Sequence, residues 1–232
     1  YAPHTRLAGK PDKVARYRAK PGAGKNRNNP ELAAMLESID EGVGAVMKTL
    51  DELKVAGNTI LIFTSDNGGE LNVTSNAPLR GGKSMLYEGG IRVPLIARWP
   101  GVAMKGAECA APVMTGDFYP TLLEAAGLRP PQGHIVDGVS FAPLLAKPDA
   151  RLEREALYWY YPLEKPHFLG GRSSGAIRQG DWKLIEFYDK DEVELFNLRD
   201  DPGEARNLAE AEPARAQRMV SNLRGWRGHF RP

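Results

Sequence analysis

The stretch between Asn58 and Pro94 constrains this chain most, because a short apolar run there passes directly into polar, glycine-rich loops. Residues 60–64 are apolar and β-branched, which predicts a strand. Asp66 and Asn67 follow it and precede two glycines. Ligands of α/β sheets bind beyond the carboxyl ends of strands, so this acid and this amide are candidate site residues. Their oxygens suit a hard cation such as Ca²⁺ or Mg²⁺.

A second loop follows, with the sequence L-R-G-G-K-S-M-L-Y-E-G-G-I-R-V-P. It carries Lys83 beside two glycines, and an ammonium acts there as a compact positive charge that can reach an anion. Taken singly, Asp-Asn-Gly is a common turn sequence and Lys83 would be a solvated surface lysine. The significance of these residues lies in their order and spacing.

Together, T-S-D-N-G-G and G-G-K-S-M-L-Y-E-G-G-I-R-V-P resemble the second half of the sulfatase family, formylglycine-dependent enzymes of the alkaline phosphatase superfamily. The likeness continues through Y-A-P-H-T, M-T-G-D-F-Y-P-T-L-L-E-A-A-G and A-I-R-Q-G-D-W-K-L-I. It implies an α/β fold, with part of an alkaline-phosphatase-like sheet flanked by helices. A small antiparallel sheet with a C-terminal helix would follow.

The resemblance also implies an activity, the hydrolysis of a sulfate ester by a formylglycine hydrate with the help of a divalent cation. Asp66 and Asn67 match late metal ligands of the family, so Ca²⁺ is expected, with Mg²⁺ as the alternative. Lys83 matches the lysine that contacts the sulfate and the leaving oxygen. His4 matches the histidine that hydrogen-bonds the ester oxygen and acts as an acid. Three further residues resemble supporting parts of the same motif: Tyr87, Glu88 and Arg92.

The sequence departs from the family at the nucleophile. No Cys/Ser-x-Pro-x-Arg motif is present, and Cys109, the only cysteine, is followed by Ala-Ala-Pro, so we expect it to be buried or half-buried. The early Asp pair, lysine and histidine of the family are also missing. We therefore expect a C-terminal portion whose formylglycine and N-terminal half lie upstream. Such a truncated sheet should expose a strand edge and an apolar face.

Two other classes of function stay open. One is a phosphate or phosphonate ester hydrolase of the same superfamily, since the same cation and lysine serve any tetrahedral anion. The other is a non-catalytic module made from a truncated sulfatase. The missing nucleophile motif would distinguish them, because a threonine or serine there would favour a phosphoesterase.

The net charge of +2 argues against a nucleic-acid binder, which needs a concentrated basic surface. No apolar run approaches the roughly 18 residues of a membrane span. The resemblance implies a sulfated small molecule or sulfated carbohydrate as partner, and a periplasmic or extracellular location. The first 29 residues are rich in Lys and Arg, which predicts a solvated face or loop. Alternatively, this segment attracts an anionic substrate.

The organisation predicts two units, residues 1–148 and 149–232, divided at Lys147-Pro148-Asp149. In the first, apolar residues at steps of three and four predict a helix over 30–56 capped by Asn29, and residues 91–98 predict a second buried strand. In the second, the period changes to that of strands at 156–161, 174–178, 182–187 and 194–197, with a tight hairpin at 179–181. A closing helix is expected over 214–230.

The remaining histidines have plainer interpretations. His134 lies in a Pro- and Gly-rich loop and is expected at the surface. His167 lies between aromatic residues and is a candidate for contacting the substrate from the second unit, with a surface role as the alternative. His229 is expected to be peripheral.

Overall fold

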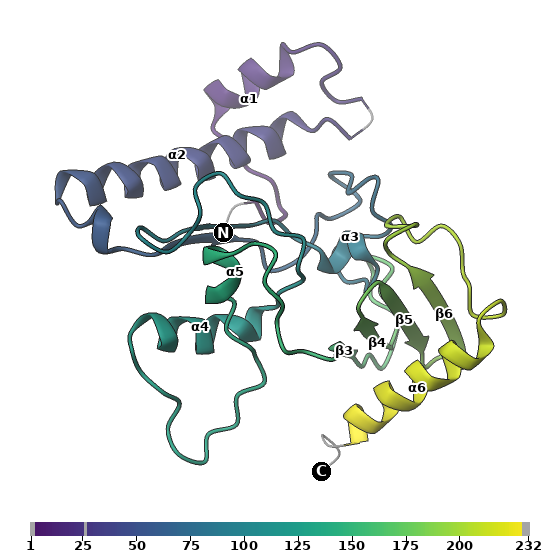
Figure 1. Cartoon of the computed structure of the whole chain (residues 1–232). Helices are drawn as coiled ribbons and strands as arrows, with labels where there is room; N and C mark the ends of the chain where they lie inside the picture. Colours follow the sequence, from purple (N-terminus) through teal and green to yellow (C-terminus); the bar gives the residue numbers. More distant parts are fainter. Residues whose placement is uncertain (1–2, 26, 229–232) are drawn as a thin grey trace.

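The computed structural model describes residues 3–25 and 27–228 (Figure 1). An N-terminal α/β part is followed by a four-stranded antiparallel sheet with a helix across it. The helices are α1 (Pro11–Arg18), α2 (Pro30–Glu52), α3 (Glu88–Ile91), α4 (Phe118–Ala125), α5 (Ala142–Ala146) and α6 (Pro213–Gly228). The strands are β1 (Leu61–Thr64), β2 (Leu95–Arg98), β3 (Leu157–Tyr161), β4 (Ser174–Gln179), β5 (Trp182–Phe187) and β6 (Glu192–Asn197). Two short 3₁₀ segments are Ala56–Asn58 and Thr115–Asp117.

The C-terminal sheet has the predicted strands, in the order β3-β4-β5-β6. Gln179 pairs with Trp182, so a two-residue turn joins β4 to β5, as the Gln-Gly-Asp sequence predicts. Gly180 takes a φ of 58°, which a glycine adopts without steric cost. Helix α6 begins at Pro213, one residue before the predicted start. The predicted end of this helix at Phe230, and His229, lie outside the described residues.

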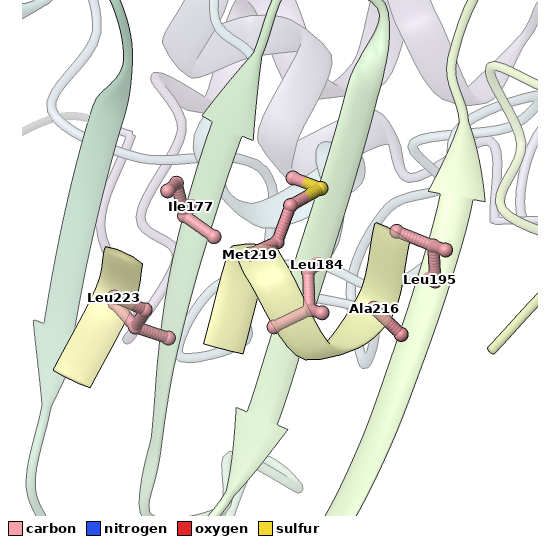
Figure 2. Packing of buried hydrophobic residues seen from close by; sticks show 6 residues of the cluster. All are labelled: Ile177, Leu184, Leu195, Ala216, Met219 and Leu223. Atoms are coloured by element: carbon pink, nitrogen blue, oxygen red, sulfur yellow. The ribbon is translucent and has the colours of Figure 1, made fainter. Parts of the chain in front are cut away.

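This sheet is buried on both faces, because successive side chains of a strand point to opposite sides. On one face, α6 packs its apolar side across the strands (Figure 2), and the cluster comprises Ile177, Leu184, Leu195, Ala216, Met219 and Leu223. The other face carries Ala176, Ile185, Phe187 and Phe196, and against it pack Leu86 and Tyr87. The segment just after Lys83 is therefore the covering layer of the small sheet.

A buried lysine accompanies this second face. The Lys183 side chain is fully buried, and its Nζ lies 2.9 Å from Oε1 of Glu88 and 2.8 Å from Oε1 of Glu204. Glu204 also accepts a hydrogen bond of 2.6 Å from the backbone N–H of Glu88 through Oε2. A charge without water persists only when it is paired, so these contacts join α3, β5 and the segment after β6.

In the N-terminal part, β1 and β2 form an antiparallel pair in which Thr64 opposes Leu95. The predicted strand over 91–98 is wrong in its first half, where α3 ends at Ile91 and an extended segment leads to β2. Pro94 has no N–H to donate to a ladder. The strand is also not buried throughout, since Ile96 is 64% exposed.

Helix α2 begins as predicted, because the Asn29 side chain accepts hydrogen bonds from the N–H groups at the first turn. It ends at Glu52, not at residue 56. Lys54 takes a left-handed φ of 58°, and its N–H and that of Val55 bond to carbonyls of the last turn. Many helices end in this way with a glycine at the left-handed position, which Lys54 occupies here.

Most Lys and Arg side chains of the basic N-terminal segment are exposed, as predicted, but part of the segment is helical and one lysine is buried. The helical part is α1, which packs along α2 (Figure 1) and buries Lys13 and Val14. The Lys13 ammonium donates to Ser38 at 3.2 Å and pairs with Glu37 and Glu41. Carboxylates of α2 therefore neutralise part of the positive charge that the sequence concentrates here.

Large apolar side chains are exposed on α2, just after it, and on β1 and β2. They include, by exposed fraction, Leu36 at 49%, Val46 at 50%, Leu53 at 65%, Phe63 at 38% and Ile96 at 64%. None of the helices in residues 3–25 and 27–228 combines the length and apolar character that crossing a bilayer requires.

Replacing Lys183 by Met should lower the free energy of unfolding by about 3–5 kcal/mol, because Glu88 and Glu204 would stay buried without their cation. Urea unfolding of the wild type and the variant measures this loss. Lys190→Met, at an exposed turn, is the matched control and should change the value by less than about 0.5 kcal/mol. Equal stability of the Lys183 variant would show that the cluster is not buried as described.

The pH dependence of stability should report on Glu204. Burial raises the pKa of this carboxyl, and the Lys183 ammonium opposes the shift. The folded state then holds the proton more tightly than the unfolded state, whose pKa is about 4.3. The stabilisation from Glu204 is lost as the pH rises through the folded pKa. Unfolding free energies of the wild type relative to Glu204→Gln should therefore fall as the pH rises above about 4.3, and a flat difference would contradict the raised pKa.

Candidate active site

The site begins at the end of β1. Thr64 donates its hydroxyl to the carbonyl of Pro94 at 3.0 Å, and the Ser65 hydroxyl donates to the carbonyl of Asn67 at 2.9 Å. These bonds hold Asp66 and Asn67 just beyond the strand. Because β2 runs antiparallel, its amino end lies at this edge. Of this pair, only β1 therefore presents its carboxyl end at the site.

Two glycine loops meet beyond this strand end. The N–H of Gly68 donates to the carbonyl of Gly90 at 2.9 Å, and the N–H of Lys83 donates to the carbonyl of Gly69 at 3.1 Å. A Cβ on Gly68 would lie 1.8 Å from the carbonyl oxygen of Gly89, so only glycine allows this approach. The loop carrying Lys83 is thus bonded, backbone to backbone, to the loop that follows Asn67.

Asn76 connects the same loops from the side. Its Oδ1 accepts from the N–H of Gly69 at 2.9 Å, and its Nδ2 donates to the carbonyls of Gly69 at 2.8 Å and Gly81 at 3.1 Å. The sequence patterns do not predict this residue. Nothing local identifies it, because its partners lie on both sides of it in the sequence.

Asp66, Asn67 and Lys83 line one open cleft of about 1530 Å³. Within residues 3–25 and 27–228, neither the carboxylate of Asp66 nor the ammonium of Lys83 has a hydrogen-bond or ion-pair partner. An acid, an amide and a cation therefore share one space with their functional groups free. A tetrahedral anion and a divalent cation are ligands that such a set can bind together.

His4 is not among the residues that line this cleft. Its exposed side chain lies with Nδ1 against the carbonyl of Thr5. Thr5 in turn donates its hydroxyl to Oε2 of Glu70 at 3.1 Å, and Glu70 directly follows Gly69. The segment of His4 is thus attached next to the Asp66 loop, and the acid role of His4 stays a prediction.

The residues after Lys83 support its loop. The Tyr87 hydroxyl donates to Oε2 of Glu194 on β6 at 2.7 Å, and the Arg80 guanidinium lies 4.0 Å from the centre of the Tyr87 ring. Burial and the neighbouring Glu194 carboxylate raise the pKa of Tyr87 well above its usual range. Arg92 is more exposed and lies 4.0 Å from Glu88.

The second unit also reaches the cleft. His167 and Arg178 line it, and the Arg178 guanidinium lies 3.9 Å from Glu88. His134 is exposed in its loop, as expected, with its ring 5.4 Å from that of Tyr119. The expectation for Cys109 is wrong: it is exposed in a loop that lines the cleft, and its Sγ lies 3.1 Å from the carbonyl oxygen of Pro148.

The residues present fit a hard cation in part. Asp66 and Asn67 offer carboxylate and amide oxygens, the ligands that Ca²⁺ takes. Among the described residues no group of three or more His, Cys, Asp or Glu side chains is gathered for a metal. Two oxygen ligands are fewer than the six that Ca²⁺ requires, so an ion held here would need further ligands.

Comparisons with known proteins match both parts of the chain. Residues 1–128 match the family described as "Sulfatase", and residues 82–225 match "N-sulphoglucosamine sulphohydrolase, C-terminal". A "Sulfatase" from Formosa agariphila is 35% identical over 97% of this chain and 44% of its own length. An "N-acetylglucosamine-6-O-sulfatase" from Bacteroides thetaiotaomicron is 34% identical over 83% of this chain and 34% of its own.

Among solved structures, Ps i-CgsB in complex with k-i-k-neocarrahexaose is similar, with a TM-score of 0.85 and 30% identity over 97% of this chain and 48% of that one. The chain thus spans less than half of each of these relatives.

The contact between the two units is testable at Gly171, in the connection from β3 to β4. A Cβ there would lie 2.0 Å from the carbonyl oxygen of Ser84, beside Lys83. Gly171→Ala should therefore lower the free energy of unfolding by about 1–3 kcal/mol. It should also speed hydrogen exchange in residues 83–86. Gly225→Ala, in α6 with open space around it, should be neutral or stabilising by up to about 1 kcal/mol. Unchanged exchange at residues 83–86 would contradict the tight contact.

Proposed function

Because this chain belongs to the sulfatase family of the alkaline-phosphatase-like superfamily, we propose that its cleft hydrolyses sulfate esters. The observation that carries the proposal is the meeting of Asp66, Asn67 and Lys83 in one cleft, with the Lys83 ammonium and the Asp66 carboxylate unpartnered among the described residues. These are the positions that match the family's metal ligands and sulfate-binding lysine. The likeness of the sequence and the position of the groups thus support the same site.

Lys83 is proposed to stabilise negative charge on the sulfate and on the leaving oxygen. Its loop is fixed by backbone bonds to Gly69 and by the packing of Leu86 and Tyr87 on the sheet, so the charge is held in place before the reaction. Donors that are fixed in advance stabilise a transition state without reorganising. His4 is proposed to give a proton to the departing alcohol. The hydrogen bond from Thr5 to Glu70 holds the segment of His4 next to the Asp66 loop, which is compatible with this role.

Asp66 and Asn67 are proposed to hold a divalent cation, most fittingly Ca²⁺, with Mg²⁺ as the alternative. When bound, such a cation supplies positive charge that lowers the energy of the reacting sulfate group. This chain would contribute two of the ligands, a carboxylate oxygen from Asp66 and an amide oxygen from Asn67.

The nucleophile is proposed to be a formylglycine contributed by a segment that precedes Tyr1. No Cys-x-Pro-x-Arg or Ser-x-Pro-x-Arg sequence occurs in these 232 residues. Two observations support a missing N-terminal half, namely the fraction of each relative that the chain spans and the exposed apolar side chains on α2, β1 and β2. On this proposal the 232 residues alone lack turnover, because the covalent step cannot begin without its nucleophile.

The substrate is proposed to be a sulfated carbohydrate. The relative from B. thetaiotaomicron is described as an N-acetylglucosamine-6-O-sulfatase, and the structure of Ps i-CgsB contains a neocarrahexaose. A periplasmic or extracellular location is proposed on the same grounds, since such polymers are met outside the cytoplasm. A phosphate or phosphonate ester hydrolase is the outcome that the assay below must exclude.

Lys83→Ala, in the protein extended to the length of its relatives, should lower kcat on 4-nitrophenyl sulfate by about 10²–10³-fold, because a fixed charge on the reacting group is lost. Lys83→Arg should recover little of the loss, since a planar guanidinium does not replace a compact ammonium. The matched control is Lys190→Ala, an exposed lysine that does not line the cleft, which should stay within about twofold.

The same assays decide between the alternatives. The unextended 232-residue chain should show no turnover, and robust turnover by it would require another nucleophile within these residues. An extended protein that hydrolyses 4-nitrophenyl phosphate and leaves the sulfate intact would support the phosphoesterase. Inactivity of the extended protein on both, with Ca²⁺ present, would support the non-catalytic module.

A further inference from the structure

A tight turn over residues 167–171 projects from the connection between β3 and β4. The N–H of His167 donates to the carbonyl of Gly171 at 2.7 Å, and the N–H of Gly170 donates to the carbonyl of His167 at 2.8 Å. Gly170 takes a φ of +95°, which side chains rarely tolerate. The turn is therefore closed by its own backbone and has little freedom to rearrange.

The turn rests on the loop of Lys83. Cβ atoms built on the two glycines would lie 2.0 Å from the carbonyl oxygen of Ser84 and 2.7 Å from Cε of Met85. Ser84 and Met85 directly follow Lys83 in the sequence. The turn is thus fixed beside the ammonium that is proposed to bind the sulfate.

The turn presents two rings. His167 lines the cleft, and its Nδ1 accepts the N–H of Leu169 at 3.2 Å, which leaves the ring proton on Nε2. Phe168 is 87% exposed, and its ring centre lies 4.5 Å from that of His167. His167 thus offers a hydrogen-bond donor in the cleft, and the exposed Phe168 ring lies directly beside it.

We propose that His167 and Phe168 recognise the sugar part of a sulfated saccharide. The Nε2–H of His167 donates to a hydroxyl of the sulfated ring, and the Phe168 ring packs against the C–H face of the adjoining ring. A saccharide fits both features, because its rings carry hydroxyls at the edge and C–H groups on the face, whereas an aryl group would leave the donor unused. This inference rests on the proposed sulfate ester hydrolysis and assigns the alcohol side of the substrate.

The test compares three substrates in the extended protein: 4-nitrophenyl sulfate, N-acetylglucosamine 6-O-sulfate and a sulfated carrageenan hexasaccharide. His167→Ala should lower the ratio of kcat/KM on either saccharide to that on the aryl sulfate by roughly five- to tenfold, the value of one hydrogen bond. Phe168→Ala should lower the ratio for the hexasaccharide alone, mainly through KM. Phe168→Tyr should restore it, because the ring is kept.

Ile135→Ala is the matched control, since Ile135 is 83% exposed in another loop and lies outside the cleft lining. It should change none of the three activities. Calorimetric titration of the hexasaccharide gives a second readout that does not need turnover, and both variants should bind it more weakly.

Several outcomes would overturn the inference. One is a wild type that cleaves the aryl sulfate but neither cleaves nor binds the saccharides, and another is an equal loss on all three substrates. These results differ from failure of the proposed function itself, which would appear as inactivity on every sulfate ester in the wild type.

Discussion

The arrangement of the site depends on the ion pairs of the buried Lys183 ammonium. This ammonium lies between Glu88, five residues after Lys83 in the sequence, and Glu204, beyond the last strand of the small sheet. Burying a lysine ammonium away from water costs free energy unless its anionic partners are well placed. The segments that carry Glu88, Lys183 and Glu204 are therefore held in one arrangement, because any other would break the ion cluster. Leu86 and Tyr87 add apolar contact on the same face of the sheet. The position of the Lys83 loop is therefore set by the C-terminal sheet.

The other half of the site is joined to this loop by the backbone. A Cβ on Gly68 would lie 1.8 Å from the carbonyl oxygen of Gly89, and a Cβ on Gly89 would lie 2.4 Å from that of Gly81, so neither residue can carry a side chain. Asn76 bonds both Gly69 and Gly81. Hydrogen bonds between main chains leave the side chains of Asp66 and Lys83 free to face a ligand. The glycines thus allow the two loops to approach closely, and the carboxylate of Asp66 and the ammonium of Lys83 stay available for a ligand.

Patterns within a segment predicted much of the fold, and contacts between segments account for what they missed. The short run Trp182–Phe187 between turn residues identifies a strand, and Asn29 before Pro30 identifies the start of a helix, because both signals are local. The same run cannot tell that Lys183 is buried, since its partners lie far away in the sequence. Cys109 was wrongly expected to be buried because residue type alone says nothing of an open loop. The motifs single out Asp66, Asn67 and Lys83 as candidates, whereas Asn76 has no motif of its own.

The sequence predicts a division at residue 148, but packing joins the Lys83 loop, which precedes this division, to the C-terminal sheet, which follows it. The family match that covers the small sheet begins at residue 82, next to Lys83, and the buried ion cluster joins the same two regions. Lys83 thus behaves as part of the C-terminal sheet, while Asp66 and Asn67 belong to the end of β1. The cleft lies where the Lys83 loop meets the end of β1. A few backbone hydrogen bonds across this contact therefore set the distance between the Lys83 ammonium and the Asp66 carboxylate. A change that loosens this contact would alter the site without touching any residue in it.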